Sequence, residues 1–95
     1  MSVRRVPSAS PPPPWVLAER RVIGAAIRAS RLRAKLTQEQ VAIRAGLDRA
    51  GVVRIESGQQ SPTTDTLVRI AAVIGVTVSD LVWREGPPPA SGVNA

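Results

Sequence analysis

The stretch from Thr37 to Gly58 reads TQEQVAIRAGLDRAGVVRIESG, and it decides the fold of this chain. Thr37 is followed three residues later by Gln40, the capping-box pattern that opens a helix. Gly46 is free to adopt the positive φ that ends such a helix. Asp48 is then a good N-cap for the next helix. We therefore predict two short helices joined by a tight turn, at about residues 38–45 and 49–56.

Each of these two predicted helices has one apolar side. Val41, Ala42 and Ala45 share a side of the first helix, and Val52 and Ile55 share a side of the second. Two amphipathic helices around a glycine turn form the outline of a helix-turn-helix, whose second helix enters the DNA major groove.

A longer helix is predicted before this stretch, from Val16 or Leu17 to Ala34. Gly24 lies inside it and is expected to loosen its start, at a cost of about 1 kcal/mol relative to alanine. The predicted inner stripe is Ile23, Ala26, Ile27, Ser30 and Ala34. The predicted solvated face carries Arg20, Arg21, Arg28, Arg33 and Lys35.

Two further helices are predicted after the stretch. The first is capped by Thr63 or Thr64 and stops at Gly75. The second covers about Ser79 to Trp83 and is capped by Thr77 or Ser79. Their apolar residues are Leu67, Ile70, Ala71, Ile74, Leu81 and Val82. With no competing strand pattern, the sequence predicts an all-α fold of five helices.

Proline-rich segments flank the predicted helices. Pro7–Pro14 and Gly86–Gly92 offer little to bury, so we expect neither to form helix or sheet. We therefore expect flexible tails at residues 1–14 and 86–95, around one folded domain at residues 15–85. The helix-turn-helix would occupy about residues 37–56 of that domain.

The composition limits the possible functions. Thirteen basic and seven acidic residues give a net charge of +6, which favours an anionic partner. The chain has no Cys and no His, so we expect no disulfide, no metal, no cofactor and no catalytic activity. There is no apolar run long enough for a membrane span or a signal peptide, and we expect a cytoplasmic protein.

This pattern of helices resembles the λ-repressor/Cro-like family, also called the XRE-type helix-turn-helix family, from about Ile23 to Val82. The residues that carry the resemblance are Thr37, Gln38, Ala42, Gly46, Val52, Ile55, Glu56, Gly58, Pro62, Thr66, Leu67, Ile74, Gly75 and Val76. The resemblance implies a buried ion pair between Arg31 and Glu56. Three residues depart from the family pattern: Lys35 where glycine is frequent, Ser30 where a larger apolar residue is frequent, and Gly51 inside the recognition helix.

The outward side of the predicted recognition helix supplies the candidates for reading base pairs, which are Asp48, Arg49, Ala50, Val53 and Arg54. Arginine can bind guanine through two hydrogen bonds, and Ala50 and Val53 can meet thymine methyl groups. Alternatively, these arginines only solubilise the helix or touch phosphate. Gln38 is expected to contact a phosphate, or else to be an ordinary first-turn residue. Gln59 and Gln60 are expected to contact the DNA backbone, or else to form an ordinary polar loop.

We therefore expect a sequence-specific transcriptional regulator, and more specifically a repressor, that binds double-stranded DNA. Because members of this family commonly bind DNA as dimers, the resemblance implies a homodimer on a palindromic operator, with the centres of its half-sites about 34 Å apart. The dimer contact is expected near Val78, Leu81, Val82 and Trp83. The alternative is a protein-interaction module, or an antitoxin or controller protein that binds a protein partner.

Overall fold

The computed structural model describes residues 11–83 of the chain. Within that range it has five helices and no strand, which confirms the predicted all-α fold. The expected tails at residues 1–10 and 86–95 lie outside the described residues. The helices are α1 (Pro14–Arg33), α2 (Gln38–Ala45), α3 (Arg49–Glu56), α4 (Thr64–Ile74) and α5 (Val78–Val82).

The helix boundaries agree with the prediction for α2 and α3, and they differ by one to three residues at the ends of α1 and α5. α1 begins at Pro14, so the expectation that residues 7–14 form no helix was wrong at its last residue. Proline is well tolerated there because the first helical residues have no intrahelical partner for their N–H groups. α5 runs from Val78 to Val82, one residue earlier than expected at each end, and its cap is Thr77, one of the two that were predicted.

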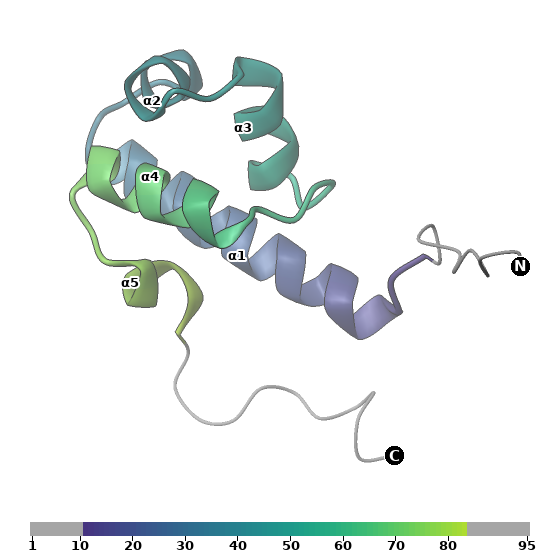
Figure 1. Cartoon of the computed structure of the whole chain (residues 1–95). Coiled ribbons are helices and arrows are strands. Elements are labelled where there is room, and N and C mark those ends of the chain that lie inside the picture. Colours follow the sequence, from purple (N-terminus) through teal and green to yellow (C-terminus); the bar gives the residue numbers. More distant parts are fainter. Residues whose placement is uncertain (1–10, 84–95) are drawn as a thin grey trace, which may run out of the picture.

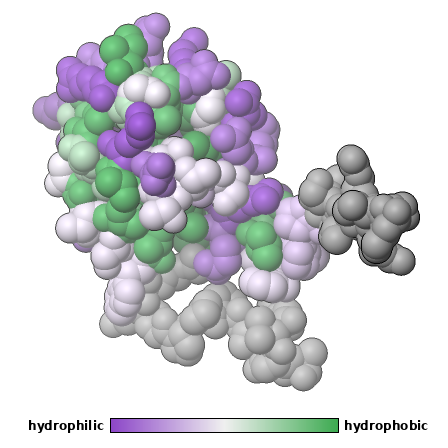
Figure 2. Space-filling view, in the orientation of Figure 1, coloured by the Kyte–Doolittle hydropathy of each residue, from purple (hydrophilic) through white to green (hydrophobic). Residues whose placement is uncertain are grey.

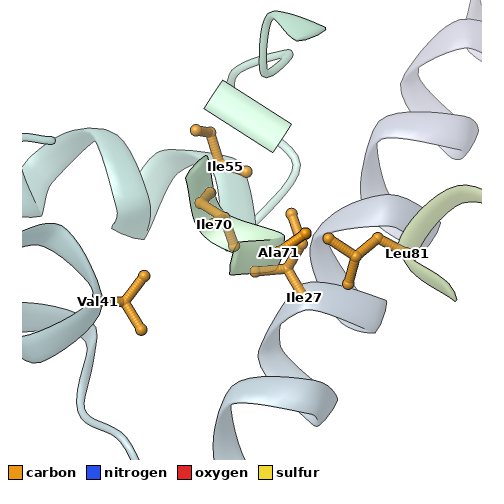
Figure 3. Packing of buried hydrophobic residues seen from close by; sticks show 6 residues of the cluster. All are labelled: Ile27, Val41, Ile55, Ile70, Ala71 and Leu81. Carbon is orange, nitrogen blue, oxygen red and sulfur yellow. The ribbon is translucent and has the colours of Figure 1, made fainter. Parts of the chain in front are cut away.

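The helices pack around a small common core. Figure 1 shows α2 and α3 together at one end of the molecule, with the long α1 and the shorter α4 beneath them. The central cluster of the core has one large buried side chain from each helix and Ala71 from α4 (Figure 3), and Val52 of α3 is fully buried as well. The five large side chains of the cluster are Ile27, Val41, Ile55, Ile70 and Leu81. Ala34, which we expected in the inner stripe, is instead exposed, because α1 ends at Arg33 and Ala34 is its C-cap.

Capping interactions fix the ends of the short helices. Thr37 and Gln40 form the predicted capping box: Thr37 Oγ1 accepts from the Gln40 N–H at 3.0 Å, and Gln40 Oε1 accepts from the Thr37 N–H at 2.9 Å. Gly46 ends α2 with a φ of 68°, in the left-handed region, as predicted. Asp48 holds the N-cap position of α3, but its side chain accepts no hydrogen bond from that helix. The predicted N-cap position is therefore confirmed, without a side-chain hydrogen bond.

Gly24 has a different role from the one its sequence context suggested. α1 runs without interruption past this residue. Gly24 is buried where α1 crosses the end of α3. A Cβ at this position would overlap the carbonyl oxygen of Ile55 and lie 2.6 Å from that of Glu56. The glycine thus permits close approach of the two helices.

The turn between α1 and α2 contains a residue with unusual backbone geometry. Lys35 has a φ of 60°, the only positive φ among the non-glycine residues described, as its place at a frequent glycine position suggested.

None of the helices in residues 11–83 is long and apolar enough to cross a membrane.

Candidate nucleic-acid interface

The two sides of α3 are sharply different. Val52, Ile55 and Glu56 are buried against the rest of the domain. The other side chains of the helix form an exposed face, and four of them line one shallow hollow of about 530 Å³. These four are Arg49, Ala50, Val53 and Arg54. The structure thus brings together the candidates for base readout, with the exposed Asp48 at the start of the helix.

The orientation of α3 is fixed by the ion pair that the resemblance implied. Arg31 Nε donates to Glu56 Oε2 at 2.6 Å, and Arg31 Nη2 donates to Glu56 Oε1 at 2.9 Å. A third bond runs from Arg31 Nη1 to the carbonyl oxygen of Leu36 at 2.8 Å. Both charged residues are buried. The hydrogen bond to Glu56 raises the pKa of the Arg31 guanidinium above its ordinary value.

Gln38 lies at the first position of α2 and is half-buried. Its amide nitrogen donates to Glu56 Oε1 at 3.1 Å. An amide nitrogen carries two hydrogens, so this bond leaves one for a ligand. Gln38 therefore combines an internal contact with a place at the positive end of the α2 dipole.

Next to Gln38 lies a groove of about 610 Å³ where the end of α1 meets the starts of α2 and α3. Arg49, Lys35 and Gln38 line it together with Glu39, so two exposed cations and one carboxylate lie beside the first turn of a helix. That combination is suited to a phosphate. From its sequence, Lys35 was expected only on the outer face of the first helix, opposite the inner stripe. One feature of the sequence indicated that Lys35 has a special place: it stands where the family frequently has glycine, in the turn directly before the capping box.

A second basic residue was also missed. Arg28 of α1 lines a smaller hollow of about 240 Å³ with Gln38, Val53, Glu56 and Ser57. It was expected on the solvated face of α1, and it is exposed, but it borders the α3 surface. Arg28 lies three residues before Arg31, so the two residues are neighbours on α1, and this spacing could have indicated that Arg28 lies near α3.

The loop after α3 folds back onto the end of that helix. The carbonyl oxygen of Arg54 accepts hydrogen bonds from the N–H of Gln59 at 2.9 Å and from the N–H of Gln60 at 3.2 Å. Ser57 Oγ donates to the same oxygen at 3.1 Å. The Arg54 side chain also takes part: its Nε donates to Gln60 Oε1 at 2.9 Å. Gln59 and Gln60 are both exposed beside the α3 face.

The turn between α2 and α3 is held from α4 by a residue that the sequence analysis did not single out. Arg69 Nη1 donates to the carbonyl oxygen of Ala45 at 3.3 Å. The Leu47 N–H donates to the carbonyl oxygen of Ala42 at 2.8 Å, which closes the turn around Gly46. Ala42 itself is buried. The angle between α2 and α3 is thus set by contacts remote from the exposed face.

Polar residues cover much of the side of the molecule seen in Figure 2, with smaller apolar areas between them.

In residues 11–83 there is no group of three or more acidic residues placed to hold a metal ion.

Comparisons with known proteins agree with this geometry. The helix-turn-helix family HTH_3 matches residues 27–81. The immunity repressor protein of Bacillus phage phi105 is 38% identical over 63 residues, which cover 66% of this chain and 44% of the repressor, less than half of its length. An HTH-type transcriptional regulator of Sinorhizobium fredii is 33% identical over 70 residues, covering 74% of this chain and 91% of the regulator.

Among solved structures, a restriction-modification controller protein from Aeromonas hydrophila has a similar fold. Its TM-score is 0.66 and its sequence identity is 28%, and the match covers 67% of this chain and 97% of the controller protein.

Proposed function

This chain belongs to the helix-turn-helix family HTH_3, whose regulators bind DNA, and we propose that it is a repressor that binds a palindromic operator as a homodimer. The observation that carries the proposal is the division of α3 into a buried side and an exposed face. Val52, Ile55 and Glu56 hold the helix, while the exposed face is free to enter a major groove.

Within this proposal, the exposed face of α3 reads the bases. Arg49 and Arg54 offer paired donors to guanine, and Ala50 and Val53 offer apolar contacts to thymine methyl groups. Asp48 is exposed at the start of α3, and its carboxylate would accept from a cytosine amino group.

The surrounding residues hold the DNA backbone. Gln38 and Lys35, beside the first turn of α2, would bind one phosphate. Arg28 and Gln59 would approach the backbone from either side of α3. The net charge of +6 supports attraction to DNA over a range set by salt.

The homodimer is proposed to form through the end of α5. Trp83 is 67% exposed and Val82 is 38% exposed, so both can bury apolar surface in a dimer. Leu81 was also expected in this contact, but it is fully enclosed by the core of its own domain. A dimer is favoured because one recognition helix reads too few base pairs for selective binding. We propose a cytoplasmic regulator that works without a cofactor, a metal or catalysis.

Selection from a pool of random duplexes tests this proposal. We expect the wild-type protein to enrich a palindrome, and Arg54→Ala to lose selectivity at one position in each half-site. Arg44→Ala is the matched control, since it removes the same charge from an exposed position on α2 that lines none of the hollows described above. Weak binding without sequence preference that disappears by about 200 mM salt would contradict the proposal and favour the protein-interaction alternative.

A further inference from the structure

Arg54 is attached to Gln60 through both its main chain and its side chain. The Gln60 N–H donates to the Arg54 carbonyl oxygen at 3.2 Å, and Gln60 Oε1 accepts from Arg54 Nε at 2.9 Å. Both residues are exposed, so the core plays no direct part in this arrangement. It makes a ring that contains the last turn of α3 and the loop that follows.

The loop itself is well anchored, so Gln60 is a defined support. Ser57 Oγ and the Gln59 N–H also bond to the Arg54 carbonyl oxygen. Gly58 has a φ of 82°, and a Cβ there would lie 2.7 Å from Cγ of Arg21, so the loop passes close to α1. The position of Gln60 relative to α3 is therefore fixed before any DNA arrives.

We propose that Gln60 is a positioning residue that determines which edge of the Arg54 guanidinium reads a base pair. This inference rests on the proposed function, in which Arg54 contacts guanine. A guanidinium can offer two donor pairs to guanine O6 and N7, either Nε with one terminal nitrogen, or both terminal nitrogens. Because Gln60 occupies Nε, the pair Nη1 and Nη2 is the one left to face the groove.

This arrangement bears on selectivity as well as affinity. A free arginine side chain loses rotamer freedom when it binds, and it can also turn toward a neighbouring phosphate. A phosphate contact is equally good on every sequence. The bond to Gln60 holds Nε before DNA binds, so Arg54 loses less rotamer entropy when it contacts the base that fits this orientation. The same bond restricts the turn of the side chain toward a phosphate. Gln60 thus acts through Arg54 and needs no DNA contact of its own.

The test compares two duplexes for each variant. The first is the palindrome that the wild-type protein enriches, and the second carries a substitution at the base pair whose preference is lost in Arg54→Ala. Gln60→Leu removes the acceptor, and we expect it to lower the affinity ratio of the two duplexes by about threefold to tenfold. Gln60→Glu keeps an acceptor and should preserve the ratio, although its charge weakens binding to both duplexes.

Two controls make the result specific. Gln59→Leu changes the neighbouring residue, whose side chain does not bond to Arg54 and which we propose to contact the backbone. It should weaken binding to both duplexes to the same extent and leave their ratio unchanged. In the Arg54→Ala background, Gln60→Leu should have no further effect on the ratio. Melting curves of each variant establish that the domain is folded.

The possible outcomes separate this inference from the proposed function. If Gln60→Leu weakens both duplexes equally, or adds fully to Arg54→Ala, then Gln60 contacts the backbone directly and the inference is overturned. If the wild type enriches a palindrome but Gln60→Leu leaves the ratio unchanged, the inference alone fails. If the wild type enriches no sequence, the proposed function fails, and this inference with it.

Discussion

Gln38 donates a hydrogen bond to Glu56 at 3.1 Å, and this joins the first residue of α2 to the last residue of α3. The oxygen that accepts it, Oε1, also accepts from Arg31 of α1. One carboxylate therefore connects three helices. It also orients the amide that we propose to contact a phosphate, so the phosphate site depends on a buried charge.

Replacement of Glu56 should be severely destabilising. Glu56→Ala leaves the buried guanidinium of Arg31 without its partner, and removal of one member of such a pair costs about 3–5 kcal/mol. For a domain of this size we expect unfolding or a greatly lowered melting temperature, measured by circular dichroism. Glu39→Ala, at an exposed position on α2, is the control and should change little. An unchanged melt for Glu56→Ala would show that the pair is dispensable.

Alanine should have opposite effects at two glycines. Gly24→Ala places a Cβ against the backbone of Ile55 and Glu56, so α1 and α3 must separate, at a cost of about 1–3 kcal/mol. Gly51→Ala meets only Asp48 Cβ at 3.8 Å, which is ordinary contact. It should stabilise α3 by up to about 1 kcal/mol, because glycine is a poor helix former. Urea unfolding of both variants checks the signs, and two changes of the same sign would contradict this account.

Lys35 should show a conflict between stability and binding. Lys35→Gly relieves the positive φ and should raise the free energy of unfolding by up to about 1 kcal/mol. It also removes a charge from the groove at the start of α2, so DNA affinity should fall and its salt dependence should decrease by about one phosphate contact. Lys35→Ala is the matched control, because it loses the charge without relieving the backbone. Higher stability in Lys35→Ala than in Lys35→Gly would argue against strain at this residue.

The start of α5 should be sensitive to acid. Backbone and side-chain hydrogen bonds with Thr77 lower the pKa of Asp80 below its ordinary value of 3.8. A carboxyl whose pKa is lower in the folded state supports folding above pH 3.8, and that support is lost as the pH falls through the folded value. NMR titration of the Thr77 amide should show a midpoint below 3.8, and Asp80→Asn should abolish the step. A midpoint at or above 3.8 would contradict the capping role.

Features set by neighbours in the sequence were predicted well. The capping box at Thr37 and the helix-ending glycines Gly46 and Gly75 depend on residues within one turn. The side of α3 occupied by Val52 and Ile55 followed from helical periodicity alone. These local rules were enough to give the boundaries of α2 and α3.

Features that depend on packing between distant segments were not predicted from local pattern, and the Arg31–Glu56 pair was expected only through the family resemblance. Gly24 was predicted to weaken its helix. The need for glycine comes from the backbone of α3, which leaves no room for a Cβ, and this contact cannot be seen in the local sequence. Arg28 was predicted to be a solvated residue of α1. Its place beside the α3 surface depends on how α1 packs against α3, which the sequence of α1 alone does not determine. The bond between Gln60 and Arg54 depends on how the loop returns after Gly58.

The division of α3 has a consequence for how such regulators diverge. The residues that hold the helix, Val52 and Ile55 among them, are separate from those on its exposed face. Substitution of exposed residues usually changes stability by no more than about 0.5 kcal/mol. A duplicated gene could therefore accumulate changes at Arg49, Ala50 or Val53 and acquire a new operator in single steps, while every intermediate still folds.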